Sequence, residues 1–292
     1  MHFSDFSDWL FHTSDRRAEL QKKQREFWTE TLKDVQPMYL LSSTPSEEPL
    51  SDLTEIEATV DATTLALCHS LMKQIAATPS EGFFAVYNTL LYHYSSQETM
   101  VVGTTFTQRN TAQLANVVGP LTTFIPIKTT IDPNQTFKEY FTGFRTDLSK
   151  SLENGDVAYE DINSEIPDTS RLPSSFRHSF SYDEMHLDAI SELKLEGMEV
   201  KNFRTLSKTM DKNQELLLDI YGKTGRIILR FNNHIFSEEK ARKFLDTYIT
   251  FIEALCHSPD SKMCDLSIFN PAETAPVTSL ETTSLLAVTT TA

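Results

Sequence analysis

Histidine and cysteine are the residue types in this sequence best suited to proton transfer and nucleophilic attack, and neither type forms a recognisable catalytic cluster. The sequence holds eight histidines and three cysteines. A histidine that acts as a general base is usually oriented by a hydrogen-bonded partner. The nearest His–Asp spacings are His12 with Asp15 and His257 with Asp260, close to the ends of predicted helices. A solvated or helix-capping role is the favoured interpretation of both.

Four other residues could do chemistry in principle. His69 and His93 lie on predicted helices without an acidic or cysteine partner at metal-ligand spacing, which favours a place in the core or at its rim. Cys68 lies in an apolar helix with nothing nearby to lower its pKa, so a small buried side chain is favoured over a nucleophile. His178 lies in a predicted strand. It is either a functional group or a sheet residue hydrogen-bonded at the edge of the fold.

The sequence argues against several classes of function. It contains no GxSxG, GxxxxGK[ST], GxGxxG or HExxH motif. A formal charge of −15 leaves no basic face for nucleic acid. The N-terminus lacks the basic and apolar regions of a signal peptide, and no stretch reaches the roughly 18 apolar residues of a membrane span. Cys68, Cys256 and Cys264 show no CxxC spacing. We therefore expect a reduced, cytoplasmic protein that binds neither nucleic acid nor membrane.

Apolar periodicity predicts the elements of the first half of the chain. They are a helical approach over residues 3–35, a strand over 54–60, helices over 62–77 and 81–94, strands over 100–106 and 121–131, and a helix over 137–152. Asp61 is the expected N-cap of the first of the two central helices. The prolines and serines between Pro37 and Pro49 indicate a linker.

The last third predicts more strands, over residues 175–182, 198–206, 215–221 and 226–233. The glycines at both ends of Gly222–Gly225 predict a hairpin between the last two. Ser237 is expected to cap a helix over 238–256. The Thr-rich tail after Asn270 is predicted to be disordered. The pattern predicts a mixed α/β fold, one sheet with helices packed against it.

Several segments of the chain resemble, in order, the condensation domains of nonribosomal peptide synthetases. Residues 97–128, QETMVVGTTFTQRNTAQLANVVGPLTTFIPIK, resemble VVVGTPVAGRN…IGFFVNTLPLR. Residues 3–9 resemble YxDFAVW, and Phe27-Trp28 with Leu32 resembles the YWxxxL that follows it. The segments NGDVAYED (154–161) and DTSRLP (168–173) resemble HQDxPFE and RDxSRNP. LSIFNPAE, from 266 to 273, resembles the exit of the domain.

The sequence departs from the family pattern at three places. Asn154 replaces a common histidine, Ala158 replaces proline, and PLTTF at 120–124 replaces FFVNT. These departures put contacts on the acceptor side in doubt. The largest departure is that the catalytic HHxxxDG, expected upstream of residues 97–128, is absent, so the chain is expected to begin just after it.

The resemblance implies the second lobe of a chloramphenicol-acetyltransferase-like fold that normally has two lobes. It implies a bridging helical segment at 1–36, a linker at 37–52, the lobe at 53–270 and a disordered tail at 271–292. It also implies a tunnel floor or support for the missing motif, for which the candidates are Gly103, Arg109, Asn110, Gly119, Thr123, Asp168, Arg171 and His178. Arg109 would hold the aspartate of HHxxxDG, or is otherwise a solvated loop arginine. No catalytic residue and no metal ligand is expected in the chain itself.

In such domains two phosphopantetheine-bound thioesters, carried by peptidyl carrier proteins, enter one tunnel and are joined as an amide. The cofactor therefore belongs to partner proteins, and the chain would need a partner that bears HHxxxDG. Three hypotheses follow from the resemblance. They are a condensation-domain part that is catalytically incomplete alone, a non-catalytic remnant or docking module, and a stand-alone acyltransferase of the same superfamily.

Overall fold

Six strands form one mixed sheet in the computed structural model, which describes residues 2–11, 15–40, 53–109, 111–157, 159–165, 176–184 and 214–266. The strands are β1 (Leu53–Thr59), β2 (Thr99–Thr107), β3 (Thr122–Thr130), β4 (His178–Asp183), β5 (Leu216–Tyr221) and β6 (Arg226–Asn232). Their order is β1-β6-β5-β4-β2-β3. The pairs β2–β4 and β4–β5 are parallel, and the other pairs are antiparallel. The predicted class, a mixed sheet with helices packed against it, is confirmed.

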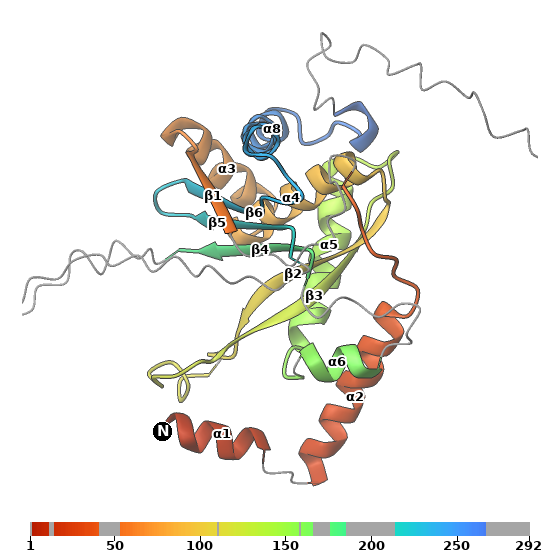
Figure 1. The fold of residues 1–292 in the computed structure, drawn as a ribbon, viewed down its shortest axis with the longest axis vertical. Coiled ribbons are helices and arrows are strands. Elements are labelled where there is room, and N and C mark those ends of the chain that lie inside the picture. The colour runs from red at the N-terminus through yellow and green to blue at the C-terminus, as the bar shows by residue number, and fades with distance from the viewer. Residues whose placement is uncertain are drawn as a thin grey trace, which may run out of the picture.

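Four helices make a connected layer on the sheet, and three more helices lie lower in the view of Figure 1. The layer consists of α3 (Ala62–Gln74), α4 (Pro79–Ser95), α5 (Phe137–Glu153) and α8 (Glu238–His257). Outside it lie α1 (Phe3–Phe11), α2 (Asp15–Leu32) and α6 (Tyr159–Glu165), and a short 3-10 helix covers Met263–Asp265. No helix in the described ranges is long and apolar enough to cross a lipid bilayer.

The helices begin where polar side chains satisfy the first amides. Asp61 accepts hydrogen bonds from the amides of Thr63 and Thr64 at 2.8 and 3.1 Å, as predicted for an N-cap. Ser237 accepts from the third amide of α8, also as predicted. Thr78 and Thr136 form capping boxes, each with the glutamate three residues later. Pro79 occupies the first turn of α4, where its missing N–H costs nothing.

Helix α4 is the centre of the core. Ten consecutive residues from Gly82 to Leu91 are buried, as expected of a helix that is apolar on most sides. The Phe84 ring stacks on Phe180 of β4 at 4.6 Å and meets Phe144 of α5 edge-on at 5.3 Å. The helix therefore ties the sheet to the neighbouring helix through aromatic contacts.

Strands β5 and β6 have one apolar, buried face and one face that mixes charged with apolar side chains. Leu216, Leu218 and Ile220 pair with Phe231, Leu229 and Ile227 on the buried side. The other side carries ion pairs. Arg226 binds both oxygens of Glu57 at 2.6 and 2.7 Å, and Arg230 bridges Glu55 and Asp219.

The structure adds detail that the sequence did not predict. The N-terminal helical approach is two helices, and α6 was not expected. Residues 37–40 of the predicted linker lie against the core, with Met38 and Leu40 buried. The Gly222–Gly225 hairpin is confirmed, with Gly225 at a φ of 68°. The predicted strand at 198–206 and the tail at 271–292 lie outside the described residues.

Candidate functional site

The loop between β2 and β3 folds around one arginine. The two strands pair along their whole length and carry the loop away from the helical layer (Figure 1). The Arg109 guanidinium donates from Nη1 to the carbonyl oxygens of Val117 (2.6 Å) and Leu114 (3.3 Å), and from Nη2 to that of Gly119 (3.1 Å). A guanidinium has about five N–H donors, so these bonds leave donors for a carboxylate. The expected contact with the aspartate of HHxxxDG stays a prediction.

The same loop packs on helix α1. Four buried apolar side chains form a cluster apart from the main core, namely Phe6, Leu114, Val117 and Leu121. Phe3 packs beside them and lies over Gly119, where an added methyl group would be 2.4 Å from the Phe3 ring. The absence of a side chain at this glycine is what allows α1 to sit on the loop.

Gly103, at the middle of β2, is a second glycine on which an aromatic ring packs closely. An added methyl group there would lie 2.3 Å from the Phe176 ring. Gly103 pairs in parallel register with Ser179 of β4, so it is the strand neighbour of the residue that follows His178. Thr123 lies in β3 opposite Phe106, towards the loop. Arg109, Gly119 and Thr123 therefore lie at the loop end of the β2–β3 hairpin. Gly103 lies at the middle of β2, beside the start of β4 where His178 is found.

His178 lies in a cluster with Arg177 and Glu215, in which His178 and Glu215 are buried and Arg177 is partly exposed. The His178 Nε2 lies 3.4 Å from Glu215 Oε2, and the two side chains are 1% and 2% exposed. Arg177 Nη1 lies 2.5 Å from Glu215 Oε1, while its guanidinium stacks over the Tyr39 ring at 4.6 Å. Glu215 immediately precedes β5, and its amide donates to the carbonyl oxygen of Arg177 at 2.7 Å. These contacts fasten the start of β4 to the start of β5.

The electrostatics of this cluster fit a structural contact between β4 and β5 better than a catalytic base. Burial by itself would raise the pKa of Glu215, but the adjacent His178 and Arg177 side chains outweigh it and hold that pKa below its usual value. A carboxylate that pairs with histidine can orient a general base. Here both side chains are almost fully buried, and their contact joins β4 to β5; the predicted role of His178 at the tunnel floor stays a prediction.

Sequence reasoning missed Glu215 as a partner of His178. The sequence shows an adjacent basic pair, Arg177 and His178, and a glutamate just before an apolar strand, but it does not show that the two strands are neighbours. Asn110, Asp168 and Arg171 lie outside the described residues, so their predicted roles stay predictions. Within the described ranges, no three His, Cys, Asp or Glu side chains are placed to hold a metal ion.

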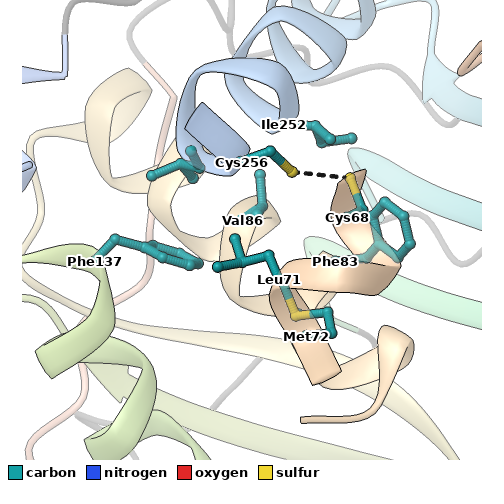
Figure 2. A pocket seen from close by; sticks show the side chains of 10 residues that line it. Cys68, Leu71, Met72, Phe83, Val86, Phe137, Ile252 and Cys256 are labelled. Atoms are coloured by element: carbon teal, nitrogen blue, oxygen red, sulfur yellow. Dashed lines mark hydrogen bonds between the residues drawn. The ribbon is translucent and has the colours of Figure 1, made fainter. Parts of the chain in front are cut away.

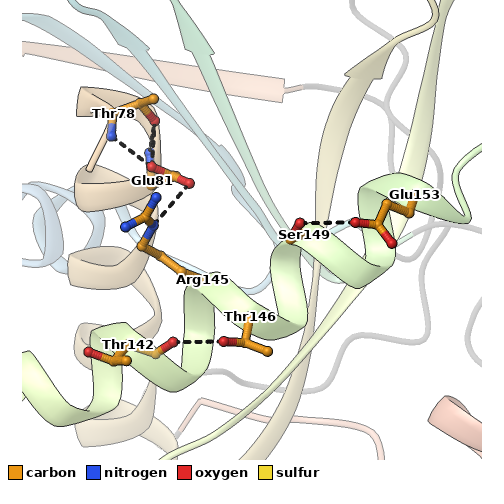
Figure 3. Close-up of polar contacts among 7 residues, drawn as sticks. All are labelled: Thr78, Glu81, Thr142, Arg145, Thr146, Ser149 and Glu153. Atoms are coloured by element: carbon orange, nitrogen blue, oxygen red, sulfur yellow. Dashed lines mark hydrogen bonds and ion pairs between the residues drawn. The ribbon is translucent and has the colours of Figure 1, made fainter. Parts of the chain in front are cut away.

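A surface groove of about 640 Å³ lies where the end of α3 and the start of α4 meet α5. Several of its polar side chains bond within the protein (Figure 3): Arg145 Nε lies 3.4 Å from Glu81 Oε1, and Thr146 donates to the backbone carbonyl oxygen of Thr142. Glu81 also completes the capping box of α4. These contacts serve helix ends and helix packing, and we assign the groove no chemistry.

With this geometry in hand, comparison with known families is decisive. The family model described as "Condensation domain" matches residues 1–278. The chain belongs to the condensation-domain family. The match covers the Arg109 loop, helix α1 that packs on it, and the His178 cluster, so all these features are parts of one condensation-domain chain.

Relatives and solved structures agree with this membership. Gramicidin S synthase 2 of Aneurinibacillus migulanus is 24% identical over 285 residues, which are 94% of this chain and 6% of the synthase. Surfactin synthase subunit 2 of Bacillus subtilis (strain 168) is 23% identical over 283 residues, 94% of this chain and 8% of that subunit. The condensation-domain chain thus spans less than a tenth of the length of these relatives.

Two solved structures share its fold. The X-domain from teicoplanin biosynthesis, solved as a complex with OxyB, superposes with a TM-score of 0.78 and 18% identity, covering 92% of this chain and 61% of that one. The condensation domain of the Monacolin K polyketide synthase MokA gives a TM-score of 0.67 and 14% identity, covering 85% and 60%. At these identities the likeness is one of fold.

Proposed function

We propose that this chain is the C-terminal part of a nonribosomal peptide synthetase condensation domain. It would serve amide bond formation between carrier-protein-bound aminoacyl or peptidyl thioesters, and only together with a segment or chain that bears HHxxxDG. The observation that carries the proposal is the family match over residues 1–278 in a sequence that contains no HHxxxDG. The coverage of about 60% of the X-domain and MokA chains supports the idea that such a domain contains more than this chain.

The arrangement of the β2–β3 hairpin supports a role as one wall of a shared tunnel. Its loop stands away from the helical layer and is held in one shape by Arg109 (Figure 1). Val118, in that loop, is 93% exposed, and Phe124 at the start of β3 is also exposed. Val118 is therefore a position at which a charged substitution can test contact with a second protein part.

In the proposed reaction the acceptor amine attacks the thioester carbonyl carbon of the donor. The C–N bond forms, the C–S bond breaks, and the amine proton ends on the departing pantetheine thiol. The HHxxxDG partner would supply the histidine that handles this proton. This chain would contribute alignment, since two tethered reactants held in one channel lose much of the entropic barrier. Phosphopantetheine would arrive on peptidyl carrier proteins, and the chain itself would bind no cofactor directly.

The second candidate is a docking module without catalysis. It is favoured by the likeness to the X-domain, whose structure was solved in complex with another protein, OxyB. Under this alternative the chain would bind a carrier protein or a neighbouring synthetase part, and no amide would form.

An association experiment separates the two candidates. The chain is mixed with the separately produced HHxxxDG-bearing part of a condensation domain, such as that of gramicidin S synthase 2, and complex formation is measured by analytical ultracentrifugation. The proposed function predicts a complex, weakened by a charged substitution such as Val118→Glu at the open loop. Binding of a loaded carrier protein without any binding of the HHxxxDG part would favour the docking module instead.

A further inference from the structure

Helices α3 and α8 bring two cysteines into contact inside the helical layer. The Cys68 and Cys256 sulfur atoms lie 3.2 Å apart although 188 residues separate them in the chain (Figure 2). Cys68 is buried, and Cys256, in the last turn of α8, is partly exposed. The exposed Cys264 is not part of the pair.

The surroundings leave the pair some freedom but no room for a ligand. A cavity of about 10 Å³ borders both thiols, and its lining includes Leu71, Met72 and Phe83 (Figure 2). That volume is at the lower limit for one water molecule, which needs polar partners as well. A disulfide has a sulfur–sulfur distance of about 2.0 Å, so the two sulfur atoms must approach each other by roughly 1 Å to form one.

The two thiols are also unlike in reactivity. The hydrogen bond between the two thiols lowers the pKa of Cys256, against the effects of burial and of the Glu253 charge. The bond to Cys256 raises the pKa of Cys68, and burial raises it further. These directions favour Cys256 as the site of the thiolate, which is the nucleophilic form. Cys256 is also the more exposed residue of the pair.

We propose that Cys68 and Cys256 form an oxidation site, at which a peroxide converts the thiol pair into a disulfide that joins α3 to α8. The Cys256 thiolate attacks one oxygen of hydrogen peroxide, the O–O bond breaks, and hydroxide leaves and is protonated to water. The sulfur of Cys68 then attacks the sulfenic sulfur, the S–S bond forms, the S–O bond breaks, and the Cys68 proton leaves with a second water. Two thiols lose two electrons in total, and the peroxide is reduced to two waters.

The disulfide would join α3 and α8, two helices that pack on segments far apart in the sequence. Helix α3 follows β1 directly, while α8 follows β6 and packs against α4 and both of these strands. Closing a loop of this length restricts the unfolded chain strongly. We expect oxidation to raise the midpoint of thermal unfolding by about 10 °C, and a reductant to reverse the change.

The test uses the full chain with Cys264→Ser, which removes cross-linking between molecules through the exposed thiol. The folded protein is treated with hydrogen peroxide, remaining thiols are alkylated, and the intact mass and peptide map are read by mass spectrometry. The expected product has lost two hydrogens and contains a Cys68–Cys256 linked peptide. With Cys68→Ser added, Cys256 should instead stop at a dimedone-reactive sulfenic acid. With Cys256→Ser added, Cys68 should stay reduced.

Two results would overturn the proposal. One is a folded Cys264→Ser protein that keeps both thiols under peroxide and forms the link only in denaturant. The other is oxidation of Cys256 to sulfinic acid while Cys68 remains free. Both are read on the Cys264→Ser protein itself, so they do not depend on whether the Cys68→Ser or Cys256→Ser chain folds.

Discussion

Phe3 in α1 covers Gly119 in the β2–β3 loop so closely that a methyl group on this glycine would lie 2.4 Å from the ring. The two residues come from separate segments that each resemble a condensation-domain motif. The contact makes α1 and the loop one small unit, together with Phe6, Leu114 and Val117.

Gly119→Ala should therefore loosen α1 without unfolding the main core. Overpacking of this kind costs about 1–3 kcal/mol, so amide hydrogen exchange in α1 should speed up by roughly ten-fold or more. Gly143→Ala is the matched control, because an added methyl group there meets nothing within 4 Å. It should stabilise α5 by about 0.5–1 kcal/mol. Equal exchange in α1 for both variants would contradict the Phe3–Gly119 contact.

Arg109→Ala should open the loop, because three carbonyl oxygens lose their donor. Cleavage of residues 107–121 by a protease should become several-fold faster, while the urea midpoint of the whole chain changes little. Arg109→Lys should behave almost like the alanine variant, since one ammonium lacks the planar fork that reaches all three carbonyls. A lysine variant as resistant as the parent would show that charge alone, and not the carbonyl contacts, orders the loop.

Glu215→Ala should be among the most damaging single substitutions in the sheet. It would leave His178 and part of Arg177 without their carboxylate in a buried place, and the expected loss is about 3–5 kcal/mol in the free energy of unfolding. Glu57→Ala removes a carboxylate that also binds an arginine, Arg226, but it is much more exposed, so its loss should be about 1 kcal/mol or less. Urea titrations of both variants check the difference. Equal losses in the free energy of unfolding would refute a stabilising role of Glu215 between β4 and β5.

His93 should give the chain a stability that depends on pH. Burial lowers its pKa to about 4 in the folded state, against a usual value of 6.5, with the Met263 backbone acting weakly the other way. As the pH falls, the unfolded chain binds this proton first, so the stabilisation is full above about pH 6.5 and is lost progressively down to about pH 4. The loss can reach about 3 kcal/mol.

Urea unfolding across that window, for the parent and for His93→Gln, isolates the effect, because the carboxylates titrate in both proteins. The parent should lose stability more steeply than the variant between the two pKa values. Parallel curves would mean that His93 is protonated as readily in the folded chain as in the unfolded one.

Local features of the fold could be predicted because neighbours in sequence decide them. The aromatic stripe from Phe137 to Leu148, the caps at Asp61 and Ser237, and the Gly222–Gly225 hairpin all follow from short-range spacing and backbone chemistry. The resemblance pointed to the Arg109 loop for the same reason, since its motif is continuous.

Contacts between distant segments could not be predicted in this way. Glu215 contacts His178 because β4 and β5 are parallel neighbours in the sheet. The sequence of either strand alone does not determine this strand order. Cys68 and Cys256 meet because α3 and α8 cross in the helical layer. Cys68 was expected to be a small buried side chain, and it is buried, but its partner lay beyond any local pattern.

The most direct test of the account is dipeptide formation. Two carrier proteins loaded with aminoacyl-phosphopantetheine thioesters are incubated with this chain alone, with an HHxxxDG-bearing part alone, and with both, and products are measured by liquid chromatography and mass spectrometry. We expect dipeptide only when both are present, and less of it when the chain carries Arg109→Ala. Dipeptide made by this chain alone would contradict the claim that its catalytic histidine must come from outside.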